Sequence, residues 1–351
     1  MACVLGLGEA LEQGTLRLPC SGLLTQAWRV AMSRSLCRRL SWAAHTRVVA
    51  VGGATLGGSG KTPLAIACAA ELSSLGISTA LIGHAHRAKP RVAREVTEGD
   101  SIEEVGDEAL VATRALRGLG VKVIVGPTRQ AAIDLGARLA RVLVLDGVAQ
   151  TLPASASLAL LAVDAAEPWG LRRAMPPRGD LRADCSELVE VCDAVVPVGG
   201  LPCPTPAEWL GLWGTSVGRE VCPAGVGGRG ALLGSGELVS WAVLRRIPVG
   251  LITALGRSDR VVRSLTDRGI RPRVVVRGAD HGPLPANLVG RASKAAKESG
   301  IALWLTTPKC SVHVARVANP PHALGAPLAT LEHVLVLSAS LVARLRRLAE
   351  P

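Results

Sequence analysis

Val48 to Pro63 read VVAVGGATLGGSGKTP, and this stretch decides the fold. A β-branched, apolar run leads into small turn residues and glycines, and an apolar helical pattern follows from Pro63 to Leu75. Glycines let backbone N–H groups curl around an anion, and the start of a helix adds partial positive charge. A strand, a glycine-rich turn and a helix in this order predict a loop that binds the phosphates of a nucleotide.

The predicted loop has the residue types that hold ATP and Mg²⁺. Lys61 would reach the β- and γ-phosphates, and the Thr62 hydroxyl would bind Mg²⁺. The remaining loop residues, expected to cradle the phosphates, are Thr55, Leu56, Gly57, Gly58, Ser59 and Gly60. The strict pattern G-x-x-x-x-G-K-[ST] is broken at its first position by Thr55. The alternative is an ordinary glycine-rich turn with a solvated lysine, but the flanking strand and helix favour the phosphate site.

Length and composition favour an α/β protein with two domains. The chain has 351 residues, of which 48% are hydrophobic, and a mean hydropathy of +0.33. Such a chain is long enough for two cores, and its hydrophobicity suits buried parallel strands. Nine scattered cysteines without a C-x-x-C pair favour reduced thiols over a zinc site. We expect no transmembrane helix and no secretion signal, because neither pattern is present.

The net charge of +12 indicates an anionic partner. An anionic membrane surface or a phosphorylated substrate would explain the charge. Nucleic acid is an alternative, but the chain has no recognised nucleic-acid module and no block of lysines and arginines. We therefore expect no nucleic-acid partner.

The order of patterns along the chain predicts four regions. Residues 1–46 contain a basic helix, Ser21 to Ala44, that would either lie in a membrane interface or pack on the next domain. Residues 47–200 alternate strands and helices, as expected for a phosphate-loop domain built on a parallel sheet. Residues 201–240 are rich in glycine and proline and are interpreted as a linker region. Residues 241–351 predict a second, smaller α/β domain.

Two further motifs carry residues suited to phosphoryl transfer. Asp146 directly follows the apolar run Arg141–Leu145, the position of a carboxylate that binds Mg²⁺ beside a phosphate loop, although plain strand-to-helix loops also carry carboxylates there. Asp107 and Glu108 open a helical pattern, where acidic residues usually serve the helix dipole. His281 lies in a loop and by itself indicates a surface residue.

The order and spacing of eight segments resemble the lipid A 4′-kinases (tetraacyldisaccharide 4′-kinases). The segments are ATLGGSGKTP, VGDEAL, VGPTRQAA, LDGVAQ, PRGDLR, DAVVPVG, ALGRSDRVVRSL and GADH. The resemblance implies a two-domain α/β fold that uses Mg·ATP to phosphorylate the 4′-hydroxyl of a tetraacylated glucosamine disaccharide 1-phosphate. It also implies an N-terminal membrane-contacting helix and work at the cytoplasmic face of the bacterial inner membrane. In that family Thr or Ser stands where Thr55 is found.

The same resemblance implies roles for individual residues. Lys61 and Thr62 would hold the phosphates and Mg²⁺, and Asp146 matches the first aspartate of the family's D-D-G-x-Q-H motif. Asp107, in the G-D-E motif, would be the base that takes the proton of the 4′-hydroxyl. His281, in the D-H motif of the second domain, would orient and polarise Asp107.

Several positions depart from the family pattern. Gly147 replaces the second aspartate of D-D-G-x-Q-H, and Thr151 replaces its final histidine. The segments S-R-G-Y-G, T-E-K-D and L-R-E-P read Gly83–Arg87, Thr307–Cys310 and Leu181–Asp184 here. The retained residues Lys61, Thr62, Asp107, Asp146 and His281 favour a working kinase.

Two other functions stay open from the sequence. A partition- or maturation-type ATPase switch also uses a phosphate loop, but its signature lysine would stand at Leu56. An inactive kinase homologue that serves as a membrane-bound scaffold is the other alternative.

Overall fold

The computed structural model describes residues 10, 21–36, 40–83, 85, 88–147, 156–199, 219–254, 258–278, 287–317, 321–348 and 350. The chain forms two compact units. The larger unit comprises Ala10–Val226 with Leu335–Pro351, and the smaller unit contains Gly227–Val334.

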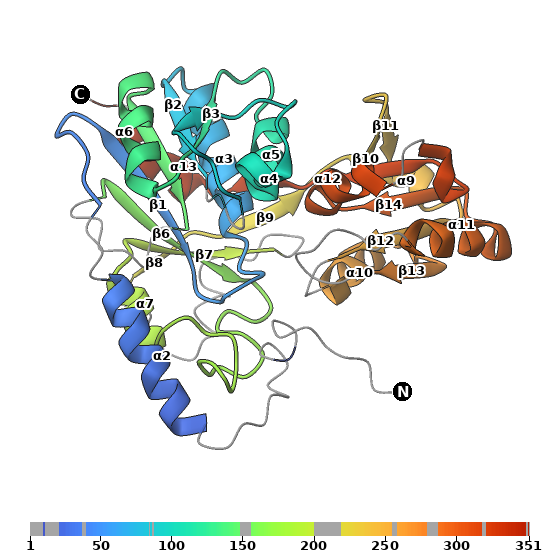
Figure 1. Cartoon of the computed structure of the whole chain (residues 1–351), viewed down its shortest axis with the longest axis horizontal. Helices are drawn as coiled ribbons and strands as arrows, with labels where there is room; N and C mark the ends of the chain where they lie inside the picture. The colour runs from blue at the N-terminus through green and yellow to red at the C-terminus, as the bar shows by residue number, and fades with distance from the viewer. Residues whose placement is uncertain are drawn as a thin grey trace. The chain divides into compact units, whose positions relative to one another are not determined.

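The larger unit is built on a ten-stranded sheet with the order β16-β9-β7-β6-β1-β5-β2-β4-β3, and β8 also pairs with β7 (Figure 1). The strands are β1 (Arg47–Gly53), β2 (Thr79–Ile82), β3 (Arg94–Glu95), β4 (Lys122–Val125), β5 (Val142–Asp146), β6 (Leu158–Asp164), β7 (Ala194–Val198), β8 (Glu220–Val221), β9 (Ala224–Gly227) and β16 (Val334–Leu337). The six strands from β4 to β7 in this order run parallel, and β3 is antiparallel to β4. Strand β1 lies in the middle and is buried on both faces, which explains its continuous apolar run.

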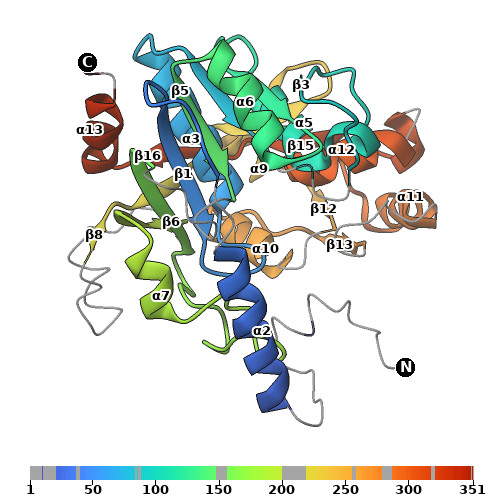
Figure 2. The same cartoon turned by 60° about the vertical axis from the view of Figure 1, so that its left-hand side comes forward.

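Helices cover both faces of this sheet. The helices are α2 (Ser21–Leu36), α3 (Lys61–Ser74), α4 (Ile102–Val105), α5 (Asp107–Ala115), α6 (Arg129–Leu139), α7 (Cys185–Glu190) and α13 (Ala339–Arg347). Helix α6 packs through Ala132 and Ile133 on one face, in a core that includes Val48 and Leu143. Helix α3 lies against β1, β2 and β5 and also contacts α5 and α13 (Figure 2). The phosphate loop therefore lies between two well-packed elements, the buried strand β1 and helix α3.

The smaller unit has a six-stranded sheet with the order β11-β10-β15-β14-β12-β13. Its elements are β10 (Gly230–Leu233), β11 (Leu238–Ser240), α9 (Trp241–Leu244), β12 (Val249–Thr253), α10 (Ser258–Asp267), β13 (Val274–Arg277), α11 (Asn287–Ser299), β14 (Leu303–Thr306), α12 (Pro308–Val317), η1 (Pro321–Leu324) and β15 (Leu328–Leu331). Trp304 is fully buried in its core, and a Cβ on Gly250 would stand 2.2 Å from the Trp304 ring. Only glycine fits at that point of β12.

The predicted fold class, a parallel phosphate-loop sheet with a second, smaller α/β domain, is confirmed. The boundaries differ from those expected. Strands β8 to β11 lie within 219–240, part of the region interpreted as a linker, because short glycine-rich strands leave little periodic signal. Residues 335–351 belong with the larger unit, since β16 pairs with β9 and Arg344 of α13 pairs with Glu220. Local pattern predicts a strand or helix but not the sheet that it joins.

The N-terminal helix is expected to span Ser21 to Ala44. In the structure, α2 spans Ser21–Leu36, and Leu40 forms an isolated bridge. Among the described residues, no helix is both long enough and apolar enough to cross a bilayer.

Candidate functional site

The phosphate loop joins β1 to α3, and the chain is tightly packed at Gly60 of the loop and at Gly53, the last residue of β1. Gly60 precedes the first helical residue, Lys61, and has a φ of +81°. A Cβ on Gly60 would lie 2.6 Å from Cγ1 of Val198, and one on Gly53 would lie 2.1 Å from Oγ of Ser59. The backbone at Gly60 therefore follows a path that residues with a side chain rarely adopt, as expected for a loop that wraps closely around phosphates.

Thr55 and Leu56, at the start of the loop, are held by a segment far away in sequence. The Thr55 hydroxyl donates to the Gly57 carbonyl at 2.6 Å, a bond that glycine in the strict pattern lacks. Arg182 donates through Nε to the Thr55 carbonyl at 2.7 Å and through a terminal nitrogen to the Leu56 carbonyl at 3.2 Å. The Leu56 N–H in turn donates to the Asp180 carbonyl at 2.8 Å. The sequence pattern predicts the loop, but nothing in it indicates the support from Asp180 and Arg182.

Thr62 and Asp146 meet as predicted. Asp146 is the last residue of β5 and pairs in register with Val51 of β1, which brings it beside the start of α3. The Thr62 hydroxyl donates to Oδ2 of Asp146 at 2.6 Å. Asp146 is 1% exposed, and its Oδ1 is buried without a hydrogen-bond partner in the described structure. A buried carboxylate oxygen with no donor, next to a hydroxyl, fits a hard divalent cation such as Mg²⁺.

Burial raises the pKa of the Asp146 carboxyl, and the charge of Glu108 raises it further, whereas Lys61, the Thr62 hydrogen bond and Arg129 lower it. The folded protein therefore binds a proton at this carboxyl more readily than the unfolded chain does. The contribution of Asp146 to stability is then most favourable below its unfolded pKa of about 3.9 and declines as pH rises through the raised folded value.

We compare the melting temperatures of the wild type and Asp146→Asn without Mg²⁺ or nucleotide. As pH rises from about 3.9 through the raised folded pKa of Asp146, the melting temperature of the wild type should fall relative to that of the variant. Mg²⁺ should reduce this shift, because the cation favours the charged carboxylate. The measurement is thermal unfolding of both proteins across a pH series. A constant difference, or one that moves toward the wild type, would contradict the assignment.

Lys61 faces the start of α5, where the G-D-E motif lies. Nζ of Lys61 is 3.9 Å from Oε1 of Glu108, and both side chains are mostly buried. Asp107, the first residue of α5, is 8% exposed, and its Oδ1 accepts a hydrogen bond from the Glu108 N–H at 2.9 Å. The structure thus brings the predicted base region to the predicted phosphate lysine. Glu108, interpreted from the sequence only as a dipole partner, is a second carboxylate of this site.

Gly147 occupies the position where the family motif has its second aspartate. Its φ is +79°, and its N–H donates to the Val51 carbonyl at 2.8 Å. A Cβ on Gly147 would meet only ordinary contacts, a terminal nitrogen of Arg129 at 3.6 Å and Cε of Lys61 at 3.8 Å. Arg129, at the start of α6, donates to the Asp146 carbonyl. Burial lowers the pKa of Arg129, and the charges of Asp146 and Glu108 oppose that shift. A Cβ at position 147 therefore fits beside the side chains of two cationic residues, Arg129 and Lys61.

We expect Gly147→Asp to raise kcat/KM for Mg·ATP about tenfold above Gly147→Asn. Both side chains tolerate a positive φ better than other residues, so their backbone cost of roughly 1 kcal/mol cancels in the comparison. Only the aspartate adds a negative charge, which would attract the neighbouring cationic side chains and Mg²⁺. Steady-state kinetics on the two variants measures the difference. Equal values for the two variants would show that the position does not contribute to the site.

His281 and Thr151 lie outside the described residues, so the proposed pairing of His281 with Asp107 stays a prediction. In the smaller unit, the Cys310 thiol accepts a hydrogen bond from the Ala254 N–H at 3.2 Å, and the Cys310 N–H donates to the Thr307 hydroxyl at 3.3 Å. Cys310 thus links the start of α12 to the residue that follows β12.

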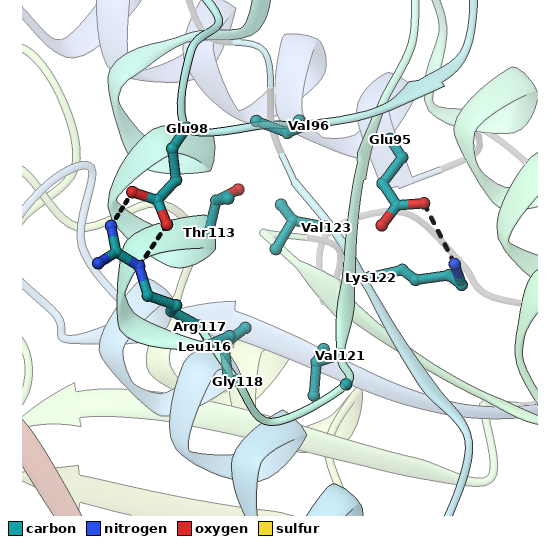
Figure 3. A pocket seen from close by; sticks show the side chains of 11 residues that line it. Glu95, Val96, Glu98, Thr113, Leu116, Arg117, Gly118, Val121, Lys122 and Val123 are labelled. Carbon is teal, nitrogen blue, oxygen red and sulfur yellow. Dashed lines mark hydrogen bonds and ion pairs between the residues drawn. The ribbon is translucent and has the colours of Figure 1, made fainter.

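A pocket of about 320 Å³ lies at the opposite edge of the large sheet, where β4 begins (Figure 3). Its charged side chains pair with each other, Arg117 with Glu98 and Lys122 with Glu95. The phosphate loop follows the carboxyl end of β1, and β4 runs parallel to β2, β5 and β1. The pocket lies where β4 begins, so it is not part of the site at the loop.

The chain is similar to known proteins over nearly its whole length. The family model described as tetraacyldisaccharide-1-P 4′-kinase matches residues 15–350. A tetraacyldisaccharide 4′-kinase of Methylobacterium sp. (strain 4-46) is 31% identical over 270 residues, covering 76% of each chain. Another, of Dinoroseobacter shibae, is 28% identical over 82% of this chain and 81% of the relative.

A solved structure shows the same fold. The crystal structure of LpxK from Aquifex aeolicus in complex with ATP superposes with a TM-score of 0.66, covering 93% of this chain and 97% of that chain at 19% sequence identity. The match of the family model, together with the site geometry, leads to one conclusion. This chain belongs to the tetraacyldisaccharide 4′-kinase family, the ATP-dependent kinases that its motif order resembles.

Proposed function

We propose that this kinase transfers the γ-phosphoryl group of ATP to the 4′-hydroxyl of a tetraacylated glucosamine disaccharide 1-phosphate, a lipid A precursor. The observation that carries the proposal is the meeting of three motifs at one place. The Thr62–Asp146 hydrogen bond and the Lys61–Glu108 pair join the phosphate loop to the end of β5 and the start of α5. The names of the relatives support the acceptor.

In this mechanism the chain's own residues position charge and accept a proton. The loop amides and Lys61 bind the β- and γ-phosphates and stabilise the charge that develops during transfer. The 4′-oxygen forms a bond to the γ-phosphorus while the bond from that phosphorus to the ADP oxygen breaks. Asp107 takes the proton of the 4′-hydroxyl at its carboxylate. His281 is proposed to orient Asp107.

Mg²⁺ is proposed to bind at Thr62 and Asp146, where it would neutralise charge on the phosphate oxygens. The unpartnered Oδ1 of Asp146 and the adjacent Thr62 hydroxyl support this choice. Glu108 and Asp146 are both carboxylates near Lys61, so the cation would also reduce their mutual repulsion.

The test is transfer of label from γ-³²P ATP to the tetraacyldisaccharide 1-phosphate, with the 4′-deoxy analogue as the matched control. We expect labelled lipid from the first acceptor only. ATP hydrolysis without lipid, coupled to ATP-driven dimer formation, would instead indicate a nucleotide switch. Failure to bind Mg·ATP would indicate an inactive homologue.

We further propose that α2 holds the enzyme on an anionic membrane, as a peripheral protein at the cytoplasmic face of the bacterial inner membrane. Ser21, Thr25, Trp28 and Met32 of α2 are partly buried, which fits the 3.6-residue period of a helix packed on the protein. The opposite face exposes Leu23, at 71%, and Val30, at 51%. An apolar helix face on a protein of net charge +12 is suited to a lipid surface.

We expect the double variant Leu23→Gln, Val30→Gln to bind anionic phospholipid vesicles at least tenfold more weakly than the wild type. Each leucine or valine buried in lipid contributes about 1.5–3 kcal/mol, so losing two exceeds a factor of ten. Leu119→Gln is the control, because Leu119 is 43% exposed but lies between α5 and β4. Co-sedimentation measures the affinity. Unchanged binding of the double variant would exclude α2 as the lipid contact.

A further inference from the structure

Helix α2 is joined to the phosphate loop through one intervening segment, Pro176–Asp184, which we call the brace. Figure 1 shows α2 beside α7, which follows the brace in the chain. Four polar contacts join α2 to the brace. They are Thr25 Oγ1 to the Pro176 carbonyl (3.1 Å), Arg178 to Ser21 Oγ (3.1 Å), Trp28 Nε1 to the Arg182 carbonyl (2.9 Å) and Arg29 to the Asp184 carboxylate (2.9 Å).

The other side of the brace binds the phosphate loop. The Arg182 N–H donates to the Ala54 carbonyl at 2.9 Å, and Leu181 forms a bridge with Thr55. The Asp180 carbonyl accepts from the Leu56 N–H at 2.8 Å. The ring of Trp28 also packs against the core cluster that contains Ala54 and Leu181. The loop backbone before its glycines is thus fixed by the brace and not by β1 alone.

Arg182 is the residue at which the two sets of contacts meet. Its carbonyl accepts the Trp28 indole N–H, and its guanidinium donates to the carbonyls of Thr55 and Leu56. The C=O and N–H of a trans peptide point in opposite directions. Holding the Leu56 carbonyl therefore turns the Gly57 N–H away from the brace. The position of α2 and the orientation of the Gly57 amide are therefore linked through Arg182.

We propose that α2 is a positioning element of the nucleotide site: Trp28, acting through Arg182 of the brace, holds the phosphate loop in the conformation that binds ATP. Trp28 and Arg182 are positioning residues in this arrangement. Coupling between two sites is reciprocal, so ATP bound at the loop also steadies α2 on the brace. The proposal rests on the proposed function only for its ligand, ATP, and does not depend on the lipid acceptor.

The first test compares Mg·ATP affinity of full-length variants by calorimetry without lipid. Trp28→Phe keeps the aromatic ring and removes the N–H donor, and we expect its Kd to rise about fivefold. Arg182→Met removes both donors to the loop carbonyls and should raise the Kd more than tenfold. Arg219→Met is the matched control, because Arg219 also donates to two backbone carbonyls, those of Val189 and Glu190, but lies outside the brace. Its Kd should stay within about twofold.

A merely structural role would lower the melting temperature without separating ATP affinity from turnover. In Trp28→Phe we expect the KM for ATP to rise while kcat at saturating ATP and the KM for the lipid stay near wild type. An unchanged Kd for ATP in a folded Trp28→Phe protein would overturn the proposal.

The second test needs no substitution. In the wild type without lipid, saturating Mg·ATP should slow amide hydrogen exchange in residues 22–32 of α2, which the brace joins to the loop. Unchanged exchange there would overturn the proposal. A wild type that binds ATP and shows this protection but fails to phosphorylate the lipid would contradict the proposed function and leave the link from α2 to the loop supported.

Discussion

Asp107→Asn is expected to lower kcat by about 10²- to 10⁴-fold, the range typical for loss of a general base. The Glu108 N–H that donates to Oδ1 of Asp107 can donate equally to an amide oxygen, so the start of α5 should keep its geometry. The Kd for Mg·ATP should stay within about twofold, since the role we propose for Asp107 is on the acceptor hydroxyl and not on the phosphates. Single-turnover kinetics and calorimetry provide the two numbers.

Asp134→Asn is the matched control for this experiment. Asp134 is an exposed aspartate of α6 that accepts a hydrogen bond from Gln130, and asparagine preserves that acceptor. Its kcat should equal that of the wild type. If Asp107→Asn keeps more than half of the wild-type kcat, Asp107 is not the base.

Lys61→Met is expected to lower kcat/KM about a thousandfold and also to weaken Mg·ATP binding. The substitution removes the positive charge that we propose binds the β- and γ-phosphates, and a thousandfold effect corresponds to a loss of ~4 kcal/mol in transition-state stabilisation. It also leaves the carboxylates of Glu108 and Asp146 without the cation beside them, which repels the triphosphate. Steady-state kinetics and ATP titration measure both effects.

Lys122→Met controls for loss of a lysine elsewhere. Lys122 pairs with Glu95 at 3.2 Å, at the far edge of the sheet. This control should bind and use ATP as the wild type does. The two large effects differ in kind, because Asp107→Asn changes kcat alone and Lys61→Met changes kcat and affinity together. A Lys61→Met enzyme within threefold of wild-type kcat/KM would contradict the assigned role of the loop.

The parts of the site that could be predicted from sequence are those determined by local chemistry. The strand, glycines and helix around Lys61 are adjacent in the chain, and Asp146 follows a buried strand whose parallel pairing with β1 brings it to the same edge. The support of the loop by Arg182 could not be predicted, because it joins residues 126 and 127 positions apart.

The role of Trp28 shows the same limit. Leu24, Trp28 and Met32 are spaced four residues apart, yet Leu24 is 43% exposed, while Trp28 and Met32 are partly buried. Which side of an amphipathic helix faces the protein depends on the surface that receives it. Gly147 gives a further example. The sequence shows that a motif aspartate is replaced by glycine, but it does not show that this residue has a positive φ and lies beside Arg129 and Lys61.

The central claim is that this kinase phosphorylates the 4′-hydroxyl, and the most direct measurement is the position of the new phosphate on the product. A ¹H–³¹P correlation spectrum of lipid isolated after reaction with Mg·ATP should show a new phosphorus coupled to the proton on the 4′-carbon, together with the original 1-phosphate. A new phosphorus coupled to any other sugar proton, or no new lipid phosphorus while ATP is consumed, would contradict the account.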